Sequence, residues 1–233
     1  MRDFITCLEF LTRVRFSKRT DWRDEDFSHS VPYFPLVGLV IGFLLAAVNY
    51  SLFYIETPLF LRVTLLLLAE IIITGGLMYD GFMDTADGVF SARSRERMLE
   101  IMKDSHVGSN AVLAIIILLL LKIAAYLELS GETLTWVLLT MSVATRTFMV
   151  VFIVNFPYAR KEGIGHMFTK YAKPFYTYIA FAVCAGIIAA CGLQYLAVAG
   201  ICFTVTLIIA QYLKTQLGGL TGLSLIHISE PTR

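Results

Sequence analysis

The sequence predicts an all-α fold: a polytopic bundle of about six transmembrane helices, with an N-terminal amphipathic helix and a cytoplasmic helix that carries an acidic motif. Two observations lead to this prediction. Hydrophobic residues make up 57% of the 233 residues and charged residues only 16%, against about 25% charged in soluble domains. The apolar residues also form long runs without charges, and about 20 such residues suffice for a helix to cross a bilayer.

The predicted elements follow one another in a simple order. The N-terminal segment spaces Phe4, Leu8 and Leu11 for one face of a helix, as in amphipathic helices at a membrane surface. Six apolar segments long enough, or nearly so, to span a bilayer follow at residues 34–53, 59–78, 111–129, 134–156, 175–191 and 196–213.

The basic residues predict the orientation of these helices. Fourteen of the nineteen Lys and Arg residues lie in three segments, namely 1–32, 79–110 and 157–174. The alternating connections contain none, at 55–58, 130–133 and 192–195. Because cytoplasmic loops are enriched in Lys and Arg, we expect the N-terminus and the three basic segments in the cytoplasm. The net charge of +1 gives no field that attracts nucleic acid, so no nucleic-acid partner is expected.

Three carboxylates in the connection 79–110 repeat with the period of a helix. Asp80, Asp84 and Asp87 stand at i, i+4 and i+7, which places them within a sector of about 60° on one helix face. Like charges this close repel one another unless a cation lies among them. Mg²⁺ fits, because it takes oxygen ligands and is typically held by one or two carboxylates plus substrate phosphate. Asp104, at the far end of the connection, belongs to the same candidate set.

A solvated acidic helix face is the alternative interpretation of this pattern. Gly81 and Gly88 count against it, because glycine weakens a surface helix and brings no structural benefit there, whereas glycine beside a ligand carboxylate lets phosphate approach the backbone. The sequence therefore favours a site for Mg²⁺ and a phosphate-bearing substrate.

Basic residues of the same connection are candidate contacts for phosphate oxygens, Arg by bidentate hydrogen bonds. They are Arg93, Arg95, Arg97 and Lys103. Cytoplasmic loops carry such residues for topological reasons as well, which is the alternative interpretation for each of them.

Two charges inside the predicted spans are informative, because a charge in a membrane is costly and usually faces a partner. Glu70 can line the deeper wall of the acidic site, and Arg146 can face either Glu70 or a substrate phosphate. A structural ion pair is the alternative for both. Lys122 and Arg62 can lie nearer the membrane boundaries or extend toward them, so they are given low importance for the site.

Several motifs together resemble one known family. They are FLTRVRF at 10–16, FPLVGLVIG at 34–42, GGLMYDGFMDTADGVFSAR at 75–93, RMLEIMKDSHVG at 97–108, NFPYARKEGIG at 155–165 and GGLTG at 218–222. On these residues the chain resembles the cobalamin synthases, the adenosylcobinamide-GDP ribazoletransferases that close the nucleotide loop of vitamin B12. The resemblance extends over nearly the whole chain to residue 222. Its most specific part is DGFMDTADG with the later EIMKDS.

The resemblance implies a multi-pass enzyme of the bacterial inner membrane. Such an enzyme joins adenosylcobinamide-GDP to α-ribazole or its 5'-phosphate, releases GMP and requires Mg²⁺. In this sequence Asp80, Asp84 and Asp87 would be the Mg²⁺ ligands, with Asp104 as a further ligand or as the base that orients the ribazole hydroxyl. The candidates for contacts with the diphosphate are Arg93, Lys103, Arg146 and Arg160. Besides the two substrates and the lipid bilayer, the implied partners include other enzymes of nucleotide-loop assembly.

Two other functions are alternatives. A CDP-alcohol phosphotransferase has the motif D-x2-D-G-x2-A-R followed by a glycine and two more aspartates. Residues 84–93 come within one inserted residue of its first half, but no aspartate follows Gly108. A secondary transporter would place its acids at the membrane midplane between inverted repeats, whereas these acids cluster in a connection and no repeat is visible.

The end of the sequence departs from the family pattern. Residues 1–222 are expected to form one integral-membrane catalytic domain. After GGLTG, family members continue with an acidic residue and a further apolar stretch, whereas this chain continues with LSLIHISEPTR at 223–233. This tail resembles non-native read-through, and we expect it to make few contacts.

Overall fold

The computed structural model describes residues 2–15, 24–129, 131–159 and 164–221. Arg160 and the tail 223–233, for which the sequence gives expectations, lie outside the described residues. Within the described ranges the secondary structure is helical, apart from an isolated β-bridge between Tyr158 and Leu220. The predicted fold class, an all-helical bundle, is confirmed.

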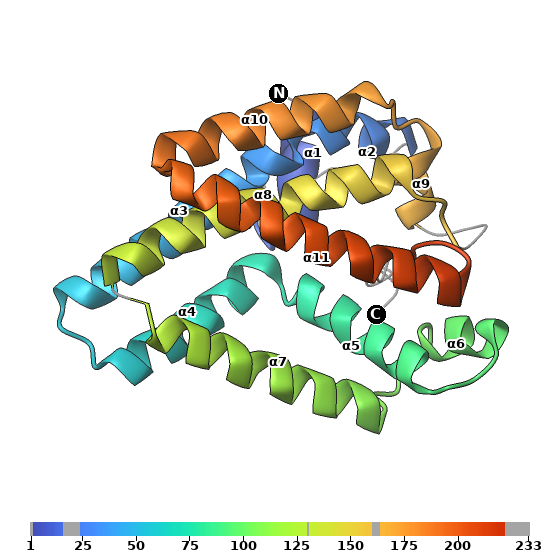
Figure 1. Cartoon of the computed structure of the whole chain (residues 1–233), viewed down its shortest axis with the longest axis horizontal. Helices are drawn as coiled ribbons and strands as arrows, with labels where there is room; N and C mark the ends of the chain where they lie inside the picture. Colours follow the sequence, from blue (N-terminus) through green and yellow to red (C-terminus); the bar gives the residue numbers. More distant parts are fainter. Residues whose placement is uncertain (1, 16–23, 130, 160–163, 222–233) are drawn as a thin grey trace.

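The helices of the described ranges follow in one order along the chain (Figure 1). They are α1 (Arg2–Leu11), α2 (Asp24–Ser30), the 3-10 helix η1 (Val31–Tyr33), α3 (Phe34–Tyr54), α4 (Leu59–Thr74), α5 (Leu77–Phe90), α6 (Arg95–Ile101), α7 (Ser109–Leu127), α8 (Gly131–Asn155), α9 (Ile164–Lys170), α10 (Phe175–Cys191) and α11 (Leu193–Leu217).

All six predicted apolar segments contain helices, but they differ in length. Four helices of the described residues are long and apolar enough to cross a membrane by themselves: α3 with its N-terminal extension, α7, α8 and α11. The helix α10 is apolar but has 17 residues. The helices α4 and α5 qualify only as a pair, and they are bent by 90° relative to each other.

The prediction of one continuous span at 59–78 is therefore wrong in its last part. The helix α4 ends at Thr74, and Gly75 and Gly76 follow with φ of 69° and 74°. This left-handed conformation is accessible to glycine at little cost, and it ends a helix. Arg13 secures the break, because its backbone N–H donates to the carbonyl of Ile73 at 2.9 Å.

The centre of the bundle is the contact between α3 and α8. A β-carbon added to Gly38 of α3 would overlap the backbone oxygen of Ser142 and lie 2.9 Å from the Cα of Val143. One added to Gly42 would lie 2.8 Å from the Cα of Leu139. These two glycines, four residues apart, therefore let the two backbones approach closely, as small residues do between membrane helices.

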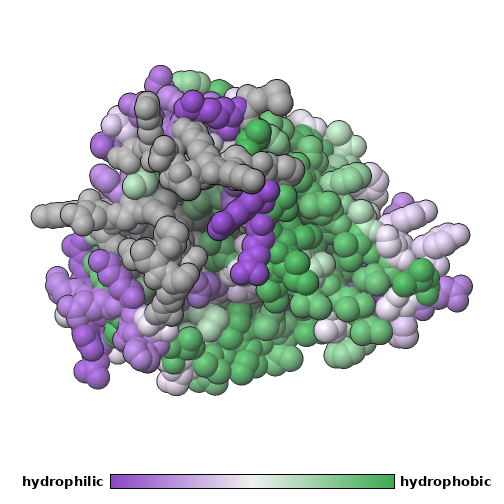
Figure 2. Space-filling model, turned by 180° about the vertical axis from the view of Figure 1, so that it is seen from behind, coloured by the Kyte–Doolittle hydropathy of each residue, from purple (hydrophilic) through white to green (hydrophobic). Residues whose placement is uncertain are grey.

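The outer helices expose apolar side chains. Only 11% of the apolar window of α7 and 6% of that of α11 are buried, against 72% for α8. In Figure 2 an apolar surface covers the middle of the molecule, and hydrophilic residues gather toward its ends. Such a band matches a lipid environment and not water, so the chain is a membrane protein.

The helices run back and forth between two ends of the molecule. The elements α5, α6 and α9 lie toward one end, and the turn between α3 and α4 lies at the other (Figure 1). The predicted acidic helix therefore belongs to one end of the bundle.

Candidate active site

The acidic helix α5 presents its three aspartates as the sequence predicts, on a regular helix. Asp80 lies in the first turn, where the exposed N–H groups of a helix favour a negative charge. The three side chains differ in environment: Asp80 is exposed, Asp84 is half-buried and Asp87 is 8% exposed. The acidic face of α5 is thus exposed to solvent at Asp80 and buried in the protein at Asp87.

Asp87 binds the start of α7 with both carboxylate oxygens. The backbone N–H of Gly108 donates to Oδ2 at 2.5 Å, and that of Ala111 donates to Oδ1 at 3.0 Å. The first N–H groups of a helix have no partner within the helix, so Asp87 caps α7 from a distance of 21 residues. A β-carbon on Gly108 would overlap this carboxylate, which explains the glycine there. Asp87 therefore has a structural role besides the metal role predicted for it.

Replacing Asp87 by Asn is expected to lower the free energy of unfolding by about 1–2 kcal/mol, because an amide has one acceptor oxygen and its NH2 group cannot accept the second backbone N–H. Thermal unfolding of the detergent-purified chain measures this loss. Glu96→Gln is the control, since Glu96 is an exposed residue of α6. Equal unfolding temperatures for Asp87→Asn and the wild type would contradict the capping role.

Gly88 has a packing role that the sequence interpretation missed. A β-carbon at this position would overlap Cγ of Met102 and lie 3.1 Å from the carbonyl oxygen of Met98. The argument that glycine in α5 brings no structural benefit is therefore wrong for Gly88, because its missing side chain admits α6. Met98 and Met102 in turn form a small apolar cluster with Leu217 of α11.

Contacts join motifs that are far apart in the sequence. The guanidinium of Arg95 lies against Gly218, which has φ of 71° and ends α11. Leu220 pairs with the 157–159 segment: its N–H donates to the carbonyl of Pro157, and its carbonyl accepts the N–H of Ala159, both at 2.8 Å. The segments 75–93, 97–108, 155–159 and 218–221 thus form one structural unit at this end of the bundle.

Asp104 is exposed in the turn between α6 and α7. Its Oδ1 accepts the backbone N–H of His106 at 3.0 Å and lies 2.6 Å from Nδ1 of the same residue. The hydrogen bond from the backbone N–H of His106 and, to a smaller extent, the one with its imidazole lower the pKa of Asp104. A carboxylate with a lowered pKa is a weaker base, so the environment of Asp104 favours a ligand or positioning role over proton abstraction.

The arrangement of carboxylates fits Mg²⁺ only with help from a substrate. Within the described residues no three His, Cys, Asp or Glu side chains converge on one point. Asp87 already accepts two backbone N–H groups, and Asp104 is bound to His106. Asp80 and Asp84 lie one helical turn apart on the same face of α5. Two carboxylates plus phosphate oxygens are an ordinary environment for Mg²⁺.

Glu70 forms an ion pair with Lys122, not with Arg146. The ammonium of Lys122 donates to both carboxylate oxygens of Glu70 at 2.6 and 2.7 Å, and to the hydroxyl of Tyr79 at 3.0 Å. The ion pair joins α4 to α7, and the hydrogen bond from Lys122 to Tyr79 connects both helices to the start of α5. The low importance given to Lys122 from the sequence is therefore wrong, since Lys122 stabilises the corner from which the acidic helix begins.

Arg146 is 7% exposed, so it is buried in α8. Its Nη1 donates to the hydroxyl of Thr145 at 3.0 Å, and its Nε has no hydrogen-bond partner in the described part of the chain. It also interacts electrostatically with Glu70 and Tyr79. Arg146 thus lies beside the Glu70 cluster, and its role toward a phosphate stays a prediction.

The other predicted phosphate contacts lie at the surface. Arg93 follows α5, Lys103 follows α6, and both are exposed. They can reach a bound anion without the cost of burying a charge. Arg160 is outside the described residues, although its neighbour Ala159 is joined to Leu220.

The partner of Glu70 could have been found from the sequence, whereas the cap of α7 could not. Glu70 and Lys122 are single opposite charges in neighbouring apolar segments, and such charges usually pair. No local pattern connects Asp87 with Gly108, because the connection depends on how α5 packs beside α7.

Fold and site together define the class: a polytopic helical membrane protein with a carboxylate-rich site at one polar end. Comparison with protein families gives a match at residues 3–223 to cobalamin-5-phosphate synthase. The chain therefore belongs to the cobalamin-5-phosphate synthase family, and it is an enzyme of the transferase type.

Individual relatives agree with this assignment. The adenosylcobinamide-GDP ribazoletransferase of Clostridium novyi is 36% identical over 226 residues, which is 95% of this chain and 89% of the relative. The protein of the same name from Desulforamulus reducens is 39% identical over 217 residues, 92% of this chain and 86% of the relative. No solved structure matches the chain.

Proposed function

We propose that this enzyme transfers the phosphorus-bearing cobinamide group of adenosylcobinamide-GDP to α-ribazole or its 5'-phosphate and releases GMP. The observation that carries this proposal is the joining of family motifs at one end of the bundle, around the acidic helix α5. The names of the relatives supply the two substrates.

The reaction would proceed as a displacement at phosphorus. The ribazole hydroxyl oxygen forms a bond to the phosphorus attached to cobinamide, and the bond from that phosphorus to the oxygen of GMP breaks. The hydroxyl proton is released to water, and GMP leaves with an added negative charge. Positioning and charge stabilisation provide most of the catalysis in phosphoryl transfer.

The residues of this end have separate tasks in the proposal. Asp80 and Asp84 would hold Mg²⁺, which neutralises phosphate charge when it is bound. Asp87 fixes α5 against the start of α7 through the two N–H groups that it accepts. Arg93 and Lys103, both exposed, would bind the diphosphate of the incoming substrate.

Release of GMP tests the proposal. Membranes that contain the chain are incubated with adenosylcobinamide-GDP and α-ribazole 5'-phosphate, and GMP is quantified with and without the second substrate. CDP-alcohols serve as control substrates. Release of CMP from these, without GMP from the corrinoid, would instead identify a CDP-alcohol phosphotransferase. Substrate uptake into vesicles without either reaction would identify a transporter.

The orientation in the inner membrane is a further part of the proposal. We expect Arg95 and Lys170 on the cytoplasmic side, and Glu56 and Glu132 on the outer side, because of the distribution of Lys and Arg. Single cysteines at these positions, in a chain without Cys7, Cys184, Cys191 and Cys202, can be labelled from either side. Labelling of position 132 from the cytoplasmic side alone would contradict the orientation.

A further inference from the structure

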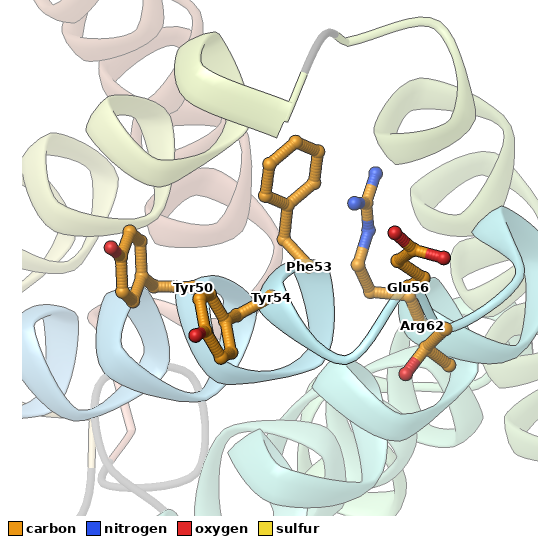
Figure 3. A pocket seen from close by; sticks show the side chains of 6 residues that line it. Tyr50, Phe53, Tyr54, Glu56 and Arg62 are labelled. Carbon is orange, nitrogen blue, oxygen red and sulfur yellow. The ribbon is translucent and has the colours of Figure 1, made fainter.

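A pocket of about 580 Å³ lies where α3 ends and α4 begins. It is lined by Tyr50, Phe53, Tyr54, Glu56, Thr57 and Arg62 (Figure 3). This turn is at the opposite end of the bundle from α5 and α6 (Figure 1). The pocket is therefore separate from the acidic helix and from the function proposed above.

The main polar group of the pocket is a buried cation. Arg62 is 7% exposed, and its Nε has no hydrogen-bond partner in the part of the chain that the structure describes. Its guanidinium lies 5.3 Å from the centre of the Phe53 ring, a cation–π arrangement. An aromatic face offsets only part of the cost of burying a charge, and no residue that the structure describes gives the guanidinium a full counter-charge.

Glu56, the carboxylate in the pocket lining, does not form an ion pair with Arg62. Glu56 is exposed, and the two side chains form no ion pair within 4.0 Å among the described contacts. In Figure 3 the guanidinium points upward between the Phe53 ring and the Glu56 carboxylate. Glu56 itself has φ of 55°, so the turn holds a residue other than glycine in the left-handed region. The turn keeps Arg62 directed into the pocket and Glu56 at its edge.

The neighbouring helix adds to the positive potential. A β-carbon on Gly131, the first residue of α8, would lie 3.7 Å from Nη1 of Arg62 and 3.2 Å from the Phe53 ring. The N-terminus of a 25-residue helix carries a positive partial charge, which the exposed Glu132 of its first turn offsets in part, so the buried guanidinium is the main group that favours an anion here.

The walls of the pocket indicate where the anion comes from. Tyr50, Phe53 and Tyr54 are exposed, and the next turn exposes Leu59, Phe60 and Leu61. Tyrosines with adjoining apolar residues at the end of a transmembrane helix are typical of the boundary between head groups and acyl chains. A molecule bound here would therefore have an anionic part at Arg62 and an apolar part along α4.

We infer that this pocket binds the phosphate head group of an anionic membrane lipid. The guanidinium of Arg62 holds the phosphate oxygens, and the tyrosine side chains surround the head group. The acyl chains lie on the exposed apolar residues of α4. Such a lipid would stabilise the α3–α4 turn in the leaflet opposite the acidic helix.

Lipid-dependent unfolding of the full chain tests this inference. The chain is purified in a neutral detergent, and its unfolding temperature is measured with added phosphatidylglycerol, phosphatidylcholine or inorganic phosphate. A ligand that binds only the folded state raises this temperature. We expect phosphatidylglycerol to raise it by a few degrees and the other two additions to raise it much less. A rise with phosphatidylcholine equal to that with phosphatidylglycerol would overturn the inference. The same rise with inorganic phosphate would show that the pocket binds free phosphate and not a lipid.

Variants connect the effect to the pocket. Arg62→Gln is expected to weaken phosphatidylglycerol binding by about tenfold or more, because it removes a charge-assisted hydrogen bond. Lys173→Gln, which changes an exposed lysine between α9 and α10, should retain wild-type binding. Thr57→Glu places a carboxylate in the lining and should abolish the lipid effect without destabilising the lipid-free protein. This second variant keeps the test valid if Arg62→Gln does not fold, and wild-type lipid binding in it would overturn the assignment.

Discussion

Asp84→Asn is expected to lower the rate of GMP release by about a hundredfold or more, by analogy with the removal of one preorganised transition-state contact. Asn keeps the shape of the side chain but removes the charge that would hold Mg²⁺. Asp84 is half-buried in the middle of α5, and Asp80 lies one turn before it. The unfolding temperature should change less than in Asp87→Asn, because the cap of α7 is intact.

Chelation of divalent cations provides the matching experiment. If carboxylates and a diphosphate share one site, their repulsion must be neutralised, so a chelator should abolish activity and added Mg²⁺ should restore it. Glu96→Gln is the control, since this glutamate lies outside the periodic set on exposed α6. Normal turnover by Asp84→Asn with unchanged Mg²⁺ dependence, together with a loss in Glu96→Gln, would refute the metal site on α5.

Gly38→Ala is expected to be the most damaging small substitution in the bundle, with a loss of about 3 kcal/mol or more. The added methyl group would overlap the backbone oxygen of Ser142. A flexible side chain could move away, but the backbone of α8 cannot move without separating the two central helices. The yield of folded, monodisperse protein in detergent and its unfolding temperature measure the effect.

Gly200→Ala is the matched control for this prediction. Gly200 lies inside α11, and a β-carbon there would meet nothing within 4 Å. Alanine has the higher helix propensity, so this variant should be neutral or more stable by up to about 1 kcal/mol. If Gly38→Ala unfolded like Gly200→Ala, the close approach of α3 and α8 would not limit stability.

The helices could be predicted because the membrane imposes a simple condition on the sequence. Backbone groups in lipid must bond within their own segment, so an apolar run of the right length becomes a helix. The break at Gly75 and Gly76 was harder to predict, because glycines also occur inside membrane helices. There the positive φ of both glycines and the hydrogen bond from Arg13 to Ile73 end the helix.

The candidate site was predictable as a set of residue types but not as a set of contacts. The spacing of Asp80, Asp84 and Asp87 follows from the helical period, and α5 has that period. Asp87, however, uses its oxygens to cap α7, which no spacing along α5 can indicate. Gly88 likewise makes room for Met102 of the neighbouring segment.

The sequence by itself determined the class of fold, the positions of the apolar helices, the acidic face and, through its motifs, the family. These properties depend on local composition and on periodicity, which the order of residues contains directly. Only the tertiary structure decided that Asp87 holds Gly108 and that Arg62 is buried in a pocket. Each of these depends on which helices lie side by side, and that choice follows from the packing of whole helix faces, such as Gly38 and Gly42 against α8.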